Sequence, residues 1–314
     1  MDNKEKNFMS VVIYVHNAEK RIDEFLKTVV NVMEENFEHS EIICVNDCSN
    51  DESVEHIKKI SIQAKSTSIS VLNMSYYHGL EMAMNAGVDL AIGDFVFEFD
   101  TTVLDFDKSE IMKVYRKSLE GFDIVSASPN RKQRLSSRAF YHVFERFTNL
   151  SHKLYTETFR ILSRRVINRI SSMNKTVPYR KAIYANCGLK TENIVYTLTN
   201  VNKDIAASDR SEKKYRGRLA VDSLLLFTEV GYRFSITMTV LMMLMTIFMI
   251  VYSIVIYVMS TPAAGWTTTI LFLSVAFFGI FGVLTIIIKY LQILLDFVFK
   301  RKRYSFESIE KLTK

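Results

Sequence analysis

The sequence predicts an α/β domain with a parallel sheet, followed by two C-terminal transmembrane helices. In the first hundred of its 314 residues, short β-branched runs alternate with amphipathic stretches, as in parallel sheets with right-handed crossovers. Residues 234–288 contain no Asp, Glu, Lys, Arg or His, which excludes a purely soluble protein. Hydrophobic residues make up 48% of the chain, which excludes a disordered or collagen-like chain.

Strands and helices are expected to alternate strictly up to residue 99. Residues 21–35 place their apolar side chains at helical spacing, and the flanking apolar runs are short and β-branched. No glycine-rich phosphate loop opens the predicted helices, which disfavours a conventional dinucleotide-binding fold. Strands are predicted at residues 10–15, 41–45, 69–74 and 94–99, and helices at residues 21–35, 51–60 and 79–90.

Charge is distributed unevenly along the chain, whose formal net charge is +6. Residues 1–128 carry 12 Lys and Arg against 23 Asp and Glu, whereas residues 129–181 carry 13 against two. A nucleic-acid-binding protein would not begin with so acidic a half, so no nucleic acid is expected as a partner. The basic segment favours a local anion, either a phosphate or the anionic face of a membrane. Three cysteines are too few for a disulfide framework and fit reduced thiols in the cytoplasm.

Residues 139–155 form an apolar stripe at helical spacing inside this basic segment. One interpretation is a helix that packs against the core of the domain. The alternative is a helix lying in the membrane interface, which the neighbouring positive charge would favour. The sequence leaves both open.

The uncharged run divides into two predicted membrane spans, residues 236–259 and 267–288. The first is 24 residues long, enough for a helix to cross a hydrocarbon core of about 30 Å. Positive residues flank the pair and none lies in the connecting loop, which predicts cytoplasmic N- and C-terminal parts in a bacterial plasma membrane. The expected organisation is a catalytic domain at residues 1–218, a juxtamembrane amphipathic segment at 219–233, the hairpin at 234–299 and a basic tail at 300–314.

Polar residues follow three of the predicted strands. Residues 16–19 read His-Asn-Ala-Glu, residues 46–51 read Asn-Asp-Cys-Ser-Asn-Asp, and Asp100 follows the strand at 94–99. Because ligands of open parallel sheets bind at the carboxyl ends of the strands, we expect these groups to converge on one edge. Each cluster alone could instead cap the helix that follows it.

Three stretches of the chain resemble the motifs of family 2 glycosyltransferases. Residues 11–19, VVIYVHNAE, resemble the opening motif V-V-I-P-x-Y-N-E-E. Residues 45–51, VNDCSND, resemble the nucleotide motif V-[ND]-D-x-S-x-D. Residues 78–87 with Gly93-Asp94 are similar to the G-x-x-x-A-x-N-x-G…G-D stretch. The resemblance implies a glycosyltransferase A-type, Rossmann-like domain that binds a nucleotide-sugar donor.

Later stretches resemble the membrane-bound subgroup related to dolichyl-phosphate mannose synthase. Residues 158–164 are similar to its Phe-Arg motif, residues 211–215 to its G-x-S-K-Y element, and Lys289-Tyr290 with Arg303-Tyr304 to its C-terminal signature. The resemblance implies an inverting hexosyltransferase that moves a sugar from a nucleoside diphosphate to a polyprenyl phosphate in the membrane. The resemblance leaves open whether the chain forms a homo-oligomer.

The resemblance also assigns roles to single residues. It implies a catalytic role for Asp100 and Arg160, with Asp100 also holding Mg²⁺ or Mn²⁺. The basic candidates for binding the acceptor phosphate or pyrophosphate could instead be solvated charges or contacts to lipid headgroups. The implied nucleotide-binding residues are Asn17, Glu19, Asp47 and Ser49, and the basic candidates are Arg131, Arg134, Arg138 and Lys213.

The chain departs from the family pattern at the expected metal motif. The family reads D-x-D where this chain reads Asp100-Thr101-Thr102, and Thr158 and Tyr14 replace an Asp and a Pro of other motifs. One carboxylate with substrate phosphates and water can hold Mg²⁺, which favours an active enzyme. Two alternatives stay open, an impaired relative that acts as a membrane scaffold or binding subunit and a transferase with another membrane acceptor. Nearby carboxylates that could substitute are Glu98, Asp105 and Asp107.

Overall fold

A computed structural model describes residues 4–131, 156–172, 180–199 and 304–313, with isolated residues between Thr237 and Leu294. The chain divides into two units. The first comprises residues 1–145, 149–220 and 302–314, and the second comprises residues 146–148 and 221–301. The predicted stripe at 139–155, the juxtamembrane segment at 219–233 and the candidates Arg134, Arg138 and Lys213 lie outside the described residues.

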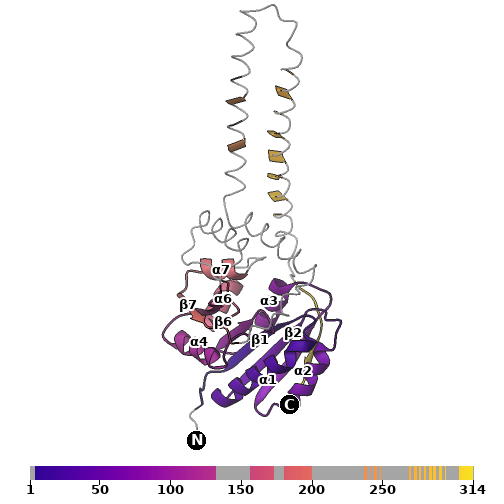
Figure 1. Cartoon of the computed structure of the whole chain (residues 1–314), viewed down its shortest axis with the longest axis vertical. Helices are drawn as coiled ribbons and strands as arrows, with labels where there is room; N and C mark the ends of the chain where they lie inside the picture. The colour runs from indigo at the N-terminus through magenta and orange to yellow at the C-terminus, as the bar shows by residue number, and fades with distance from the viewer. Residues whose placement is uncertain are drawn as a thin grey trace, which may run out of the picture. The chain divides into compact units, whose positions relative to one another are not determined.

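An eight-stranded mixed sheet forms the centre of the first unit, with the order β7-β5-β6-β4-β1-β2-β3-β8 (Figure 1). Strands β4, β1, β2 and β3 run parallel to one another. Strand β6 runs antiparallel to β4 and β5, and β8 runs antiparallel to β3. The strands are β1 (Met9–Val15), β2 (Ser40–Asn46), β3 (Thr67–Met74), β4 (Phe95–Phe99), β5 (Ile124–Pro129), β6 (Phe159–Ser163), β7 (Thr191–Tyr196) and β8 (Phe306–Lys311).

Helices cover both faces of the sheet (Figure 1). The core on one face contains side chains of α1, α2 and α4, and the core on the other contains side chains of α3, α6 and α7. Side chains alternate between the faces along each strand, so Phe97 and Phe99 of β4 pack in the first core and Val96 in the second. The helices are α1 (Glu19–Asn36), α2 (Ser53–Ser61), α3 (Leu80–Leu90), α4 (Ser109–Leu119), α6 (Arg164–Ser172) and α7 (Arg180–Asn186).

The α/β class is confirmed, and every element predicted before residue 100 lies within two residues of its expected bounds. The four predicted strands are parallel, as expected, but the whole sheet is mixed because β6 and β8 are antiparallel. Strand β6 lies inside the basic segment and carries a charged residue at its second position, so its alternation does not resemble that of a buried strand. The strand is nevertheless buried, because Arg160 pairs with the carboxylate of Glu98 on the neighbouring strand β4.

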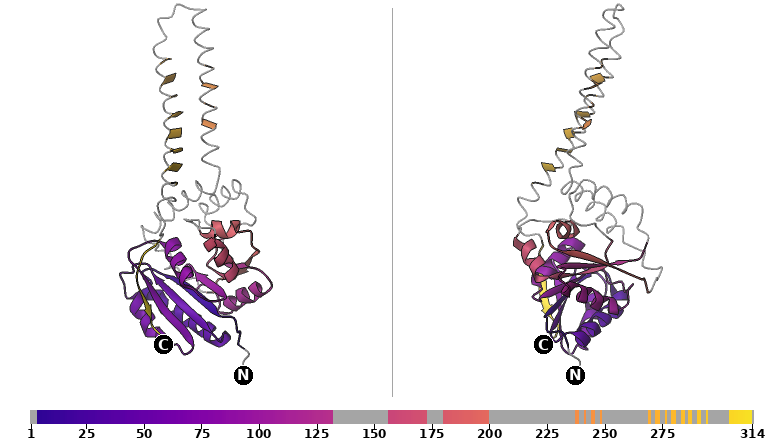
Figure 2. Two further views of the ribbon diagram at one scale, coloured as in Figure 1. Left: turned by 180° about the vertical axis from the view of Figure 1, so that it is seen from behind. Right: turned by 90° about the vertical axis from the view of Figure 1, so that its left-hand side faces the viewer.

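Strand β8 differs from the free basic tail expected at residues 300–314. It pairs with β3 at the edge of the sheet, with Leu72 opposite Ile309 (Figure 2). The side-chain amide of Asn73 donates to Ser308 Oγ and to Glu310 Oε1, both at 3.0 Å. Residues on both sides of the uncharged run therefore belong to one sheet.

The close approach of α3 to the sheet depends on a glycine. A Cβ atom at Gly87 would lie 2.4 Å from Val12 Cγ1 and 2.6 Å from Val45 Cγ2. Both distances are far below van der Waals contact, so only glycine lets α3 lie this near β1 and β2. This packing holds the loop that precedes α3 against the carboxyl ends of the strands.

In the second unit, the isolated residues described between Thr237 and Leu294 are helical. The part of the chain that the structure describes contains no helix with the length and apolarity needed to span a membrane. The two spans predicted at 236–259 and 267–288 stay predictions, since most of their residues lie outside the described part.

Candidate functional site

The loops that follow β1 and β2 are bound to each other at the carboxyl edge of the sheet. The backbone N–H of Asn17 donates to Ser49 Oγ at 3.1 Å, and its side-chain oxygen accepts the N–H of Asn50 at 2.9 Å. The N–H of Glu19 donates to Asp51 Oδ2 at 3.0 Å. Asn17 has a φ of 47°, a left-handed conformation that asparagine tolerates. The structure thus brings Asn17, Glu19 and Ser49 together, as the motifs predicted.

Asp47 lies directly beneath these loops and is completely buried. Its carboxylate accepts the backbone N–H groups of His78 and Gly79, each at 2.8 Å, and the hydroxyl of Tyr14 at 3.0 Å. Asp47 therefore joins the loop after β2 to the loop that opens α3. The proline of the family motif is replaced here by Tyr14, whose hydroxyl is one of these partners. A role of Asp47 toward a nucleotide stays a prediction.

Two aromatic side chains belong to the loop after β3, whose backbone N–H groups bind this carboxylate. The rings of Tyr76 and His78 are stacked with centroids 3.9 Å apart, and 60% of Tyr76 is exposed. The N–H of Ser305, just before β8, donates to His78 Nε2 at 3.2 Å. Sequence reasoning missed this aromatic pair, although a Tyr-Tyr-His run directly after a strand was a visible signal.

Four charged side chains form a closed ring on the sheet face that carries α3 and α7. Glu98 of β4 lies directly opposite Arg160 of β6, and Asp100 follows at the carboxyl end of β4. Arg180 is the first residue of α7. Each arginine donates one Nη to Glu98 and the other to Asp100, and all four N–O distances are 2.7 Å. We call Glu98, Asp100, Arg160 and Arg180 the arginine–carboxylate ring.

Additional side chains fix the Arg160 side of the ring. The Nε of Arg160 donates to Glu157 Oε2 at 2.8 Å. Its guanidinium carbon lies 5.5 Å from the centroid of the Tyr184 ring, a cation–π contact. The Tyr184 hydroxyl donates to Glu98 at 2.9 Å. These contacts pair Nε and both Nη atoms of Arg160, and both carboxylate oxygens of Glu98, inside the domain.

The Arg180 side of the ring is anchored to α3. The Nε and the backbone N–H of Arg180 both donate to Glu81 Oε2 at 2.9 Å. Arg180 is 1% exposed and Glu81 is 3% exposed. Buried charges are tolerated only when they are paired and hydrogen-bonded, and this network meets that condition.

Electrostatic interactions keep Asp100, Arg160 and Arg180 charged. Burial opposes ionisation of Asp100, but the positive charges of the two ring arginines and of Lys181 outweigh it and hold the pKa of Asp100 below its ordinary range. Burial alone would lower the pKa of Arg160 and Arg180, whereas the facing carboxylates raise both pKa values well above the ordinary one. Asp100, Arg160 and Arg180 therefore carry charge at neutral pH.

Asp100, the expected metal ligand, is not surrounded by groups that would help to bind a metal ion. Oδ1 of Asp100 accepts from Arg180 and Oδ2 accepts from Arg160. Thr102, which stands where the family has a second carboxylate, is 4% exposed and offers only a hydroxyl. The described residues contain no group of three or more His, Cys, Asp or Glu side chains that could hold a metal ion. Mg²⁺ and Mn²⁺ prefer carboxylate oxygens, so this set of side chains does not fit the cofactor that the motif implied.

The basic candidates differ in their placement. Arg160 has an exposed fraction of 0%, so it lies inside the domain rather than at a surface open to an acceptor phosphate. Arg131 is exposed, and its charge acts on Asp105. Arg180 was missed, because residues before it offer no recognisable strand or motif.

The substitute carboxylates at 105 and 107 do not join the ring. Burial raises the pKa of Asp105, whose Oδ1 accepts the Tyr196 hydroxyl at 2.8 Å. Thr158 shares a hydrogen bond of 2.7 Å with the same hydroxyl. Asp107 Oδ1 accepts the N–H of Ser109 at 2.9 Å, a local hydrogen bond at the start of α4. These residues fix the loop after β4.

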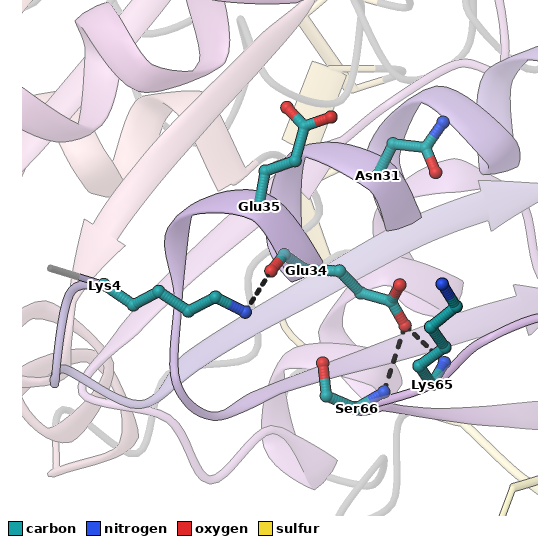
Figure 3. Close-up of a pocket in the computed structure, with 6 residues that line it drawn as sticks. All are labelled: Lys4, Asn31, Glu34, Glu35, Lys65 and Ser66. Carbon is teal, nitrogen blue, oxygen red and sulfur yellow. Dashed lines mark hydrogen bonds between the residues drawn. The ribbon is translucent and has the colours of Figure 1, made fainter. Parts of the chain in front are cut away.

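A separate pocket of about 380 Å³ lies at the C-terminal end of α1 (Figure 3). Glu34 accepts the backbone N–H of Lys65 and of Ser66, the latter at 3.1 Å, and its carbonyl accepts from Lys4 Nζ. Because α1 runs back from the carboxyl ends of the strands, this pocket lies at the opposite edge of the sheet from Asp47. It is not the candidate site.

Several known proteins are similar to this chain. An uncharacterised glycosyltransferase from Synechocystis sp. is 28% identical over 194 residues, 60% of each chain. A prophage bactoprenol glucosyl transferase homolog from Escherichia coli is 28% identical over 194 residues, 60% of this chain and 62% of the relative. An undecaprenyl-phosphate 4-deoxy-4-formamido-L-arabinose transferase from Aeromonas hydrophila is 29% identical over 133 residues, 42% of this chain. The last match spans 40% of that relative, so this chain covers less than two thirds of all three.

The family model described as glycosyl transferase family 2 matches residues 10–174. These residues are more than half of the chain and include β1 to β6, both joined loops and three members of the arginine–carboxylate ring. The match confirms the family that the motifs predicted. The chain belongs to glycosyl transferase family 2.

Proposed function

We propose that this chain transfers a sugar from a nucleoside diphosphate donor to a polyprenyl phosphate in a membrane. A phosphate oxygen of the lipid attacks the anomeric carbon from the side opposite the leaving group. A new carbon–oxygen bond forms as the bond to the nucleoside diphosphate breaks, which inverts the anomeric configuration. A phosphomonoester with a second pKa of about 6 is largely ionised near neutrality, so the reaction requires no strong general base.

The observation that carries the proposal is the family match over the strands whose carboxyl ends meet at one edge. At that edge Asn17 binds Ser49 and Glu19 binds Asp51, and the exposed ring of Tyr76 lies in the loop after β3. Ligands of open α/β sheets bind at such an edge, and we therefore place the nucleotide-sugar donor there. An exposed aromatic ring offers a stacking surface for a nucleobase, and backbone amides with side-chain oxygens suit a ribose.

The lipid acceptor is proposed from the names of the relatives and from the uncharged run. Two relatives are named for transfer to bactoprenol and to undecaprenyl phosphate. Described residues of the run carry large apolar side chains that are exposed. Exposed apolar side chains on helices that bear no charge favour contact with lipid. Examples are Leu244 at 62%, Phe248 at 63% and Ile280 at 57%.

The position of strand β8 favours a helical hairpin that crosses the membrane twice over a single membrane crossing. It lies in the same sheet as β3, on the other side of the uncharged run in the sequence. Two parts of one sheet must be on the same side of a membrane, so the chain between them crosses it an even number of times. The absence of charge in the loop of the predicted hairpin favours a cytoplasmic location for the sheet, in a bacterial plasma membrane.

Incubation of the purified full-length chain with labelled nucleotide sugars and undecaprenyl phosphate tests the proposal. The donors are UDP-glucose, UDP-N-acetylglucosamine and GDP-mannose, each with and without the lipid phosphate. We expect label to enter the organic phase only when the lipid is present, and mild acid to release the sugar. No lipid-linked label from any donor would contradict the proposal.

A second function, a membrane scaffold or binding subunit without transfer activity, is favoured by the arginine–carboxylate ring. Both oxygens of Asp100 are engaged, and Thr102 replaces the second carboxylate of the motif. The same incubation separates the two functions, since a scaffold gives no labelled lipid.

A further inference from the structure

The arginine–carboxylate ring lies where the sequence predicted a divalent cation. Asp100 ends β4 at the carboxyl edge, and two guanidinium groups bind its two oxygens at 2.7 Å. Glu98, two residues earlier on the same face, is bound by the same two groups at 2.7 Å. Two guanidinium groups together carry the formal charge of one Mg²⁺ or Mn²⁺ ion.

The ring is a built feature of the fold. The register of β4 and β6 places Glu98 opposite Arg160, and the anchor on Glu81 places Arg180. Exposed fractions are 0% for Glu98 and Arg160 and 1% for Arg180. An exposed ion pair contributes little, but planar guanidinium forks on buried carboxylates are strong and directional.

Replacing the guanidinium groups with a metal ion would be costly. A cation bound by both Asp100 oxygens would break hydrogen bonds to Arg160 and Arg180 and leave both arginines short of a partner in the interior. Thr102 could not compensate, because a hydroxyl brings no charge. The ring and its flanking Glu81 and Glu157 already satisfy one another.

On the basis of the proposed function, we infer that Arg160 and Arg180 take the place of the divalent cation, so that this chain binds a nucleotide-sugar donor without one. The two guanidinium groups neutralise carboxylates that would otherwise repel a pyrophosphate, and so no bridging ion is needed. Glu98 and Asp100 are positioning residues, since they hold the guanidinium groups in place.

Calorimetric titration of the full-length chain in detergent tests the inference without any substitution. UDP-glucose, UDP-N-acetylglucosamine and GDP-mannose are titrated in EDTA and, separately, in MnCl₂. We expect the bound donor to have the same affinity in both buffers. Binding that requires Mn²⁺ overturns the inference and leaves the proposed function intact. Absence of binding in both buffers for all three donors overturns the proposed function, and the inference with it.

The variant Arg180→Gln gives a second measurement, with Mn²⁺ alone as the probe. Removal of this guanidinium deprives Glu81 of its arginine partner and leaves Arg160 as the one remaining guanidinium group in the ring for Glu98 and Asp100. We expect Mn²⁺ to raise the Tm of the variant and to leave the Tm of the wild type unchanged. Arg165→Gln is the matched control, because Arg165 also binds a carboxylate, Asp123, but outside the ring. A rise in the wild-type Tm with Mn²⁺ contradicts the inference, even if Arg180→Gln does not fold.

Discussion

At the scale of single residues, the carboxylates of the site act mainly on the protein itself. Asp47 holds two loops together through three hydrogen bonds, and Asp100 holds two guanidinium groups. Neither side chain offers an oxygen that is free of a protein donor in these contacts. Their substitution should therefore change stability as well as any binding at the edge of the sheet.

Asp47→Asn should lower the free energy of unfolding by about 1.5–3 kcal/mol, the usual value for hydrogen bonds to a buried charged group. The asparagine amide would bring an NH₂ group toward the N–H donors of His78 and Gly79. Nucleotide affinity should also fall, because the loops at the edge lose their common anchor. Denaturant unfolding and calorimetry measure the two effects, with the exposed Glu120→Gln as control. An unchanged free energy of unfolding would show that Asp47 does not anchor these loops.

Asp100→Asn should lower the free energy of unfolding at neutral pH by about 3–5 kcal/mol, because it breaks a buried charge network. The difference from the wild type should shrink on acidification. The pKa of Asp100 is lowered in the folded chain, so the unfolded chain takes up this proton first, below its ordinary pKa of about 3.9. The stabilisation is thus complete above that pH and is lost as the pH falls below it.

Unfolding midpoints of wild type and Asp100→Asn, measured from neutral pH down to about pH 3, check this expectation. The half-buried Asp23→Asn is the matched control, since the Asp23 carboxylate pairs with His56, outside the ring. A gap between wild type and Asp100→Asn that stays constant with pH would show that ionisation of Asp100 contributes nothing to the fold.

At the scale of elements, local pattern explains which parts could be predicted. The first four strands and three helices followed from apolar spacing, because each buries a regular face. Strand β6 and helix α7 could not be found in this way, since Arg160 and Arg180 are buried by carboxylates of Glu81, Glu98 and Asp100, 60 to 99 residues away. Likewise the motif located Asp100 correctly at the edge, but its two partners are revealed only by the pairing of β4 with β6 and by the placement of α7.

Gly87→Ala tests the packing of α3 on the sheet. The new Cβ would overlap Val12 Cγ1 and Val45 Cγ2, and overpacking of this kind costs about 1–3 kcal/mol. Thermal unfolding should show the loss, and Val12→Ala in the same chain should recover part of it by removing one of the two clashes. Additive losses in the double variant would mean that the clash with Val12 is not the cause.

At the scale of the whole molecule, the proposed hairpin predicts the sides on which two cysteines react. In a Cys48→Ser background, a cysteine at Ala263 should be labelled only from the outside of intact cells. A cysteine at Glu307, an exposed residue of β8, should be labelled only after the cells are opened. A membrane-impermeant maleimide is the reagent. Labelling of both positions from the same side would contradict the hairpin.

The pairing of β3 with β8 also determines at what point during synthesis the sheet can be completed. Asn73 and Ser308 are 235 residues apart in the sequence, so the edge of β3 stays open until residues 306–311 have left the ribosome. An unpaired edge strand is a template for pairing with other chains, and closing so long a loop carries an entropic cost. A chain that stops before residue 306 would therefore lack the strand that covers β3, and the sheet formed by the first half of the chain would keep an open edge.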